Sequence, residues 1–212
     1  MGISESKRQK QLAKKKKKRT MKRTAAVPTV GSSSNALRLA KQSAILPIHE
    51  CLVPEGLFDK SGMGTVVISR KMAGANFAIS VILLDAYCLG VKNAYFRVVS
   101  STEYKEMLFH ISMNETLKSV EPACARKLVE SCIAYARKIG FNPHPDYKSA
   151  QYIFGDIEAD SCAESYTFGK DGKPFYIAGP HDDAIKVRKI LKTLQESCGE
   201  GNYEYMVSME NL

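Results

Sequence analysis

The chain has 212 residues, of which 44% are hydrophobic, so it is long enough to bury a core and is not a disordered protein as a whole. Its formal net charge of +9 is concentrated at one end. Residues 1–24 hold eleven cationic residues and one acidic residue, whereas the rest of the chain holds 20 and 21. The charge therefore excludes a general attraction of residues 25–212 for nucleic acid.

Residues 1–24 are predicted to form a disordered polycationic arm, because they lack apolar periodicity and contain five consecutive lysines that repel one another. An arm of this kind binds a phosphate backbone and releases its counterions. The alternative is a tail that only aids solubility. The candidate nucleic-acid-binding residues are Lys7, Arg8, Lys10, Lys14, Lys15, Lys16, Lys17, Lys18, Arg19, Lys22 and Arg23.

Residues 25–44 are predicted to be a linker followed by a short helix. Pro28, Gly31 and three serines interrupt residues 25–35, and a helix is expected over 35–42 with Ser34 or Asn35 as its cap. Residues 45–212 are then expected to form a single globular domain.

Three extended segments are expected to open that domain. Residues 45–53 enter it as an extended stretch, in which Pro47 disfavours a central ladder position. Residues 65–70 and 76–85 are predicted to be strands of a hairpin, and the second is apolar on both faces, as suits a sheet covered on both sides. A further strand is expected over 94–99.

Helices are predicted next. Residues 102–110 are expected to form one, with Thr102 as its cap, and residues 147–154 a short one. The clearest pattern covers 122–139, where apolar residues recur every three or four positions between Pro122 and Gly140.

The C-terminal part is predicted to contain a hairpin and a last helix. Residues 166–168 and 174–177 are expected to pair across a tight turn at Asp171-Gly172. Asp182 is expected to cap a helix over 183–197 that ends at Gly199. The predicted apolar stripe of that helix, with basic residues opposite, is Ile185, Ile190, Leu191 and Leu194. This order of elements predicts an α+β fold: a mostly antiparallel mixed sheet packed with three to five helices, preceded by the disordered basic arm.

The six cysteines are expected to be reduced. No apolar leader segment begins the chain, the domain is large enough to need no disulfides, and Cys124 and Cys132 fall in a helical pattern as small apolar residues. The longest apolar run, 77–84, is too short to span a membrane as a helix. We therefore expect no transmembrane segment and a cytoplasmic location.

Four segments resemble an uncharacterised family of bacterial proteins. They are Leu-Pro-Ile-His-Glu-Cys at 46–51, Leu-Leu-Asp-Ala-Tyr-Cys-Leu-Gly-Val-Lys-Asn-Ala at 83–94, Gly-Phe-Asn-Pro-His-Pro-Asp-Tyr at 140–147, and Phe-Gly-Lys-Asp-Gly-Lys-Pro-Phe-Tyr-Ile-Ala-Gly-Pro at 168–180. The resemblance covers about residues 45–205 and implies a bacterial cytosolic origin. No activity, cofactor or catalytic residue comes with it.

The candidate catalytic residues are His49, Cys51, Asp85 and Cys88. In an extended segment His49 and Cys51 share a face, where an imidazole can activate a thiol; the alternative is a buried cysteine beside a hydrogen-bonded histidine. Asp85 ends the most apolar strand. It is expected to cap the following turn, to pair with Arg70 or Lys92, or to act as an acid or base.

Two further patterns are weaker. The acidic stretch of His144, Asp146, Asp156, Glu158 and Asp160 has the residue types for a hard cation, but its spacing fits no known metal loop, and solvated carboxylates are the alternative. The segment at 169–173 is not a phosphate loop, because Pro174 and a strand follow it; Lys170 and Lys173 can still contact phosphate from a turn. We expect no metal and no cofactor.

These patterns lead to three functional hypotheses. The first is a nonenzymatic protein that binds structured RNA or the ribosome through the arm. The second is a hydrolase, nuclease-like or cysteine-dependent, that the arm tethers to nucleic acid. The third is an adaptor that binds a protein partner through the exposed face of the last helix.

Overall fold

The computed structural model describes residues 33–179 and 182–207. Internal contacts divide the chain into two units, 1–36 and 37–212, and the structure described below is that of the second unit, apart from residues 33–36 at the start of α2. The eleven cationic residues of the arm lie outside the described residues. The expected boundary between residues 44 and 45 stays a prediction.

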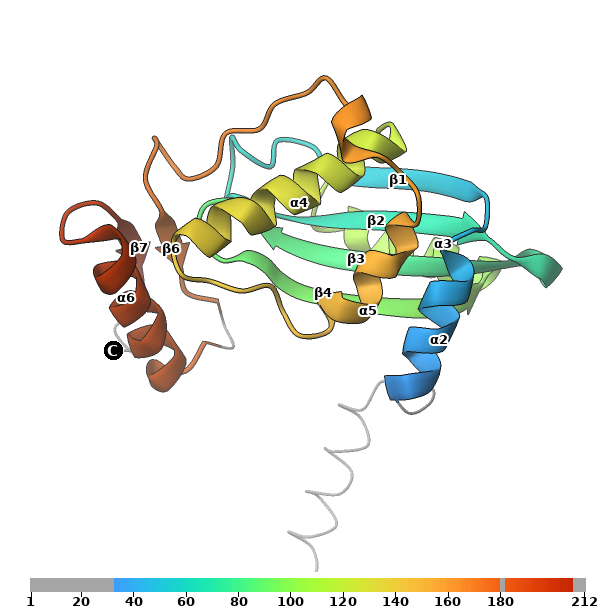
Figure 1. The fold of residues 1–212 in the computed structure, drawn as a ribbon, viewed down its shortest axis with the longest axis horizontal. Helices are drawn as coiled ribbons and strands as arrows, with labels where there is room; N and C mark the ends of the chain where they lie inside the picture. Colours follow the sequence, from blue (N-terminus) through green and yellow to red (C-terminus); the bar gives the residue numbers. More distant parts are fainter. Residues whose placement is uncertain (1–32, 180–181, 208–212) are drawn as a thin grey trace, which may run out of the picture. The chain divides into compact units, whose positions relative to one another are not determined.

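A five-stranded antiparallel sheet forms the centre of this unit (Figure 1). Its strands are β1 (Ile48–Pro54), β2 (Met63–Lys71), β3 (Asn76–Asp85), β4 (Gly90–Ser100) and β5 (Leu117–Ser119), in the order β4-β3-β2-β1-β5. The strands expected over 65–70, 76–85 and 94–99 are confirmed, each in register with its neighbour. The three-residue β5 was not predicted, because it is too short to show an alternating pattern.

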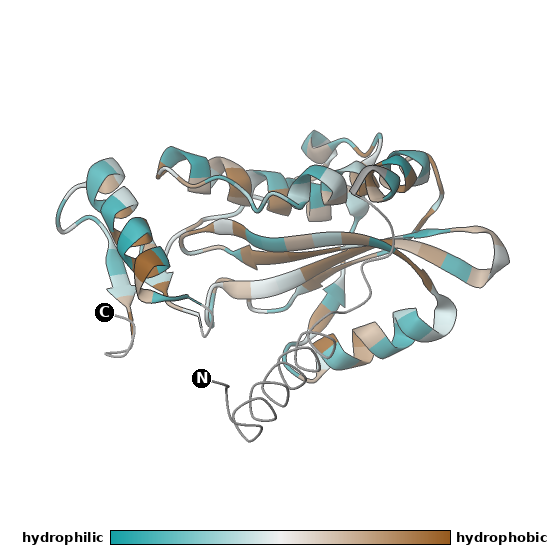
Figure 2. Cartoon of the chain, turned by 90° about the horizontal axis from the view of Figure 1, so that it is seen from below, coloured by the Kyte–Doolittle hydropathy of each residue, from teal (hydrophilic) through white to brown (hydrophobic). Residues whose placement is uncertain are grey.

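Each face of the sheet buries an apolar layer, as expected from the apolar sequence of β3. On one face Ile68 and Ile82 pack with Val129 of α4 (Pro122–Lys138), and on the other Val67 and Ile79 pack with Tyr104 of α3 (Ser101–Ser112). Figure 2 shows helices on both sides of the sheet, with apolar strands between them. The fold class is therefore α+β, as predicted.

Side-chain hydrogen bonds to the first backbone amides determine where α3 begins. α3 starts one residue earlier than expected, because Ser100 and Glu103 form a capping box: Ser100 Oγ accepts from the Glu103 amide, and Glu103 Oε2 accepts from the Ser100 amide at 2.8 Å. Thr102, the predicted cap, lies inside the helix. α2 (Ser33–Ser43) and α5 (Tyr147–Ala150), the latter continued by the 3-10 turn η2 (Gln151–Phe154), agree with the predicted helices, and a further turn, η3, covers Ala159–Ser161.

The C-terminal part pairs differently from the prediction. Asp171 and Gly172 do form a tight turn with positive φ angles, and Lys170 bridges Lys173 across it. However, the segment before the turn forms no strand, and β6 (Phe175–Ile177) instead pairs in parallel with β7 (Glu204–Met206). A sequence pattern cannot distinguish the two, since three-residue strands take their partner from tertiary packing.

The last helix, α6 (Ala184–Cys198), lies where it was predicted and ends at Gly199, whose φ is 80°. Its cap is Asp183, which accepts a hydrogen bond from the Lys186 amide at 2.8 Å, and not Asp182. Its buried stripe is Val187, Ile190 and Leu194, whereas Ile185, predicted to face inward, is 80% exposed.

Candidate functional site

His49 and Cys51 lie on opposite faces of the sheet, contrary to the prediction. Ile48 pairs with Arg70 and Glu50 with Ser69, so His49 is an extra residue in β1, a β-bulge. The bulge turns His49 toward the α3 side, where its ring contacts Phe77 at a centroid distance of 4.6 Å. Cys51 packs in the core on the α4 side. The imidazole therefore does not activate the thiol.

Cys51 is also a poor nucleophile by its surroundings. The residue is 2% exposed, and burial raises the pKa of its thiol to about 11, although the charge of Arg70 acts in the opposite direction. At pH 7 only about one molecule in 10⁴ carries the thiolate.

Glu50 belongs to a polar cluster on the α3 side that the sequence did not predict. The Tyr104 hydroxyl donates to Glu50 Oε1 at 2.6 Å and lies 3.0 Å from Ser69 Oγ. Burial, and then the hydrogen bond to Glu50, raises the pKa of Tyr104 well above its usual range. This cluster holds α3 against β1 and β2, because its members come from all three elements.

Asp85 and Cys88 are close together and both are buried. Asp85 Oδ1 accepts hydrogen bonds from the Tyr87 amide at 3.1 Å and the Cys88 amide at 2.9 Å, so this carboxylate caps the turn after β3. Burial raises its pKa to about 6, against the opposing effect of these hydrogen bonds and of Lys92. Burial also raises the pKa of Cys88, which is completely inaccessible to solvent. Capping, one of the three expected roles of Asp85, is the one its contacts support.

Arg70, an expected partner of Asp85, is used elsewhere. Its guanidinium donates to the backbone carbonyls of Leu46, Ile153 and Phe154, and the Ile153 bond is 2.6 Å long. This buried cation therefore joins β2 to the segments before β1 and after α5.

The partner of Lys92 is Asp182, a residue expected only to cap a helix. Asp182 Oδ2 lies 3.6 Å from Lys92 Nζ, and Oδ1 lies 2.6 Å from Lys186 Nζ. The Tyr176 hydroxyl and the Gly179 amide also donate to Asp182. Burial raises the pKa of this carboxyl, but the hydrogen bonds and cations outweigh that effect and hold it at about 2. The signal in the sequence was Lys92 itself, a cation next to the apolar Val91 in β4, which called for a carboxylate partner.

The acidic stretch does not assemble into a metal site within the described residues. No three His, Cys, Asp or Glu side chains there form a group that could hold a metal ion. Asp146, Asp156 and Asp160 are exposed at separate turns, as solvated carboxylates usually are.

Exposed basic side chains occur over much of the folded unit, and two groups of them lie close together in sequence, one at the tight turn and one on α6. Lys170 and Lys173 lie at the tight turn, where Lys173 Nζ donates to the Gly201 carbonyl. The outward side of α6 carries Lys186, Arg188, Lys189 and Lys192. Both places can contact an anion, but their charge is small beside that of residues 1–24.

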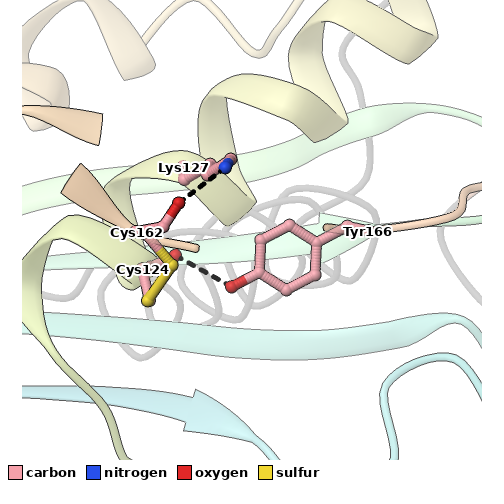
Figure 3. The surroundings of a disulfide bond; sticks show 4 residues. All are labelled: Cys124, Lys127, Cys162 and Tyr166. Atoms are coloured by element: carbon pink, nitrogen blue, oxygen red, sulfur yellow. Dashed lines mark hydrogen bonds between the residues drawn. A yellow bond between two sulfur atoms is a disulfide. The ribbon is translucent and has the colours of Figure 1, made fainter. Parts of the chain in front are cut away.

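The expectation that all cysteines are reduced is wrong for one pair. Cys124, at the start of α4, and Cys162, just after η3, form a disulfide with a Cα–Cα distance of 5.0 Å. Figure 3 shows the contacts beside it, in which Tyr166 Oη donates to the Cys124 carbonyl and Lys127 Nζ to the Cys162 carbonyl. The pair is separated by 38 positions in sequence, so no local pattern predicts it. Cys51, Cys88, Cys132 and Cys198 are free.

None of the described helices is long and apolar enough to cross a membrane. Comparison with protein-family models, with curated proteins and with solved structures finds no match. This agrees with the expectation that the resemblance brings no known activity.

Proposed function

We propose that this protein is a nonenzymatic RNA-binding protein that captures the phosphate backbone with residues 1–24. The observation that carries the proposal is the division of charge, +10 in those residues and −1 in the rest of the chain. Eleven cations can neutralise several phosphates and release their counterions. The segment contains no aromatic residue, so it cannot stack on bases and its binding is indifferent to sequence. A structured RNA or a ribosome, with many phosphates in a small volume, suits such a segment.

The hydrolase alternative has less support. His49 and Cys51 face opposite sides of the sheet, and Asp85 and Cys88 are 3% and 0% exposed, with the Asp85 carboxylate engaged in capping. A nucleophile and its base must lie within hydrogen-bond reach of one another and of a substrate.

The adaptor alternative also has little support. Ile185 is 80% exposed on α6, between an acidic cap and basic residues. Single exposed apolar residues are normal on protein surfaces, so this residue alone does not indicate a partner.

The RNA proposal is tested by fluorescence anisotropy with a labelled structured RNA, on the full chain and on a variant with Lys14, Lys15, Lys16, Lys17 and Lys18 replaced by Gln. If six to ten phosphates are engaged, affinity of the wild type falls about 10³- to 10⁵-fold between roughly 50 and 200 mM salt. The variant is expected to bind more weakly. The slope of log affinity against log salt concentration should also become less steep, by about 0.7–0.9 for each lysine whose phosphate contact is lost.

The matched control replaces five exposed lysines of the folded unit that lie outside the tight turn and outside α6: Lys60, Lys71, Lys105, Lys138 and Lys148. Because it removes the same charge, it separates a local effect of the arm from an effect of net charge. Equal losses in the two variants, or an unchanged affinity in the arm variant, would reject the proposal.

A further inference from the structure

A cavity of about 440 Å³ lies beside the disulfide. Its walls come from the end of β1 and the loop after it, from the start of α4, and from residues 164 and 166. The volume is in the range of small-molecule sites. Leu57 and Leu128 form an apolar floor, since both are at most 5% exposed.

Two aromatic rings form one wall. The rings of Phe58 and Tyr166 stack, with centroids 6.1 Å apart and planes inclined by 20°. Both are held in place: Phe58 packs edge-on against Phe168 at 5.6 Å, and the Tyr166 hydroxyl is bound to the Cys124 carbonyl. The Tyr166 hydroxyl is thus already engaged (Figure 3), so a ligand in the cavity would contact its ring.

The charged groups around the cavity are mostly negative. Asp59, Glu121 and Glu164 contribute three carboxylates, and Lys118 contributes one cation. All three acidic residues are exposed. Among the described residues none of these carboxylates lies within 4.0 Å of a cationic side-chain nitrogen. The cavity therefore combines an apolar floor, aromatic rings and a rim with three carboxylates and one cation.

We propose that this cavity binds a small organic cation, an ammonium group carried on an apolar body. Aromatic rings attract cations through their negative faces, and the carboxylates add to that attraction. The apolar body would displace water from Leu57 and Leu128. An anion is disfavoured by the rim, and a neutral ligand of the same shape gains only the apolar contacts. The site is independent of the RNA proposal, which concerns a partner of opposite charge.

The test uses the full chain and two probes of matched shape, 2-phenylethylammonium and 2-phenylethanol, with binding followed by isothermal titration and by ¹H–¹⁵N NMR. The cation is expected to bind with a dissociation constant of about 1 mM or tighter. The alcohol is expected to bind about tenfold more weakly. Amide shifts should be largest around residues 57–59, 121–128 and 164–166.

Variants separate the contribution of the carboxylates to binding from that of the aromatic rings. The double variant Glu121→Gln with Glu164→Gln should weaken binding of the cation several-fold and leave binding of the alcohol unchanged. Phe58→Leu should weaken the binding of both probes. The control, Glu158→Gln with Glu196→Gln, removes the same charge from exposed positions that do not line the cavity. Equal affinity for the two probes, no cation binding up to about 10 mM, or equal losses in control and cavity variants would overturn the proposal.

Discussion

Asp85 offers a direct measurement of how a buried carboxylate affects stability. In the folded chain burial raises its pKa from the ordinary 3.8 to about 6. Below about pH 4 the group is protonated in both folded and unfolded chains and has no effect. Between about pH 4 and pH 6 the unfolded chain ionises this group while the folded chain keeps it protonated, so the free energy of unfolding falls; above about pH 6 the group is ionised in both and the fall ends. A shift of roughly two units corresponds to about 3 kcal/mol.

Asp85→Asn should remove this dependence. An amide oxygen can accept the same two hydrogen bonds from Tyr87 and Cys88, but it does not ionise. The difference in unfolding free energy between variant and wild type should therefore grow in favour of the variant by about 3 kcal/mol between about pH 4 and pH 8. Any cost of the new NH₂ group is the same at each pH and does not alter this slope.

The assay is urea unfolding followed by circular dichroism at intervals across this range, with the slope m compared at each pH. Asp160→Asn, an exposed change of the same kind, is the control. If the difference in unfolding free energy between Asp85→Asn and wild type does not depend on pH, or if it favours the wild type as pH rises, the raised pKa of Asp85 is refuted. In that case the attraction of Lys92 would outweigh burial.

Three further outcomes are expected. Cys162→Ser should lower the free energy of unfolding by about 2–4 kcal/mol, because it opens a closed segment of 38 positions; reduced wild type should match it in denaturant titrations, and Cys198→Ser is the free-cysteine control. Asp182→Asn should cost about 3 kcal/mol, since it leaves the Lys92 ammonium buried without its counter-charge. Adding Lys92→Met should recover much of that loss, and no recovery in a double-mutant cycle would argue against the pair. Tyr104→Phe should cost about 1–2 kcal/mol by removing the donor to Glu50, and an undiminished midpoint in thermal melts would contradict that contact.

The sequence predicted the elements whose pattern is both long and regular. The helix predicted over 122–139 is observed at 122–138, and the strand predicted over 76–85 has these bounds, because the apolar pattern of each extends over about ten positions or more. The turn at Asp171-Gly172 was also predictable, since its backbone angles select those residue types.

Long-range geometry was not predictable in the same way. The bulge at His49 depends on how β1 aligns with β2, and one extra residue moves that side chain to the other face. The disulfide and the Lys92–Asp182 pair join positions 38 and 90 residues apart, which a reading of local periodicity cannot bring together. The prediction that His49 and Cys51 share a face was wrong for this reason, because it assumed an unbroken extended strand.

Two kinds of polar group in the folded unit bear on function in different ways. Buried groups such as Arg70, Asp85 and Asp182 each have their hydrogen bonds satisfied by the chain itself, so a ligand could reach them only by breaking structure. The carboxylates at the cavity, in contrast, are exposed, and in the part of the chain that the structure describes no cationic nitrogen lies within 4.0 Å of them. Groups of the second kind can change partner at little cost in stability. We therefore expect substitutions that weaken binding in this protein to be tolerated by its fold, and substitutions at Arg70, Asp85 or Asp182 to alter stability first.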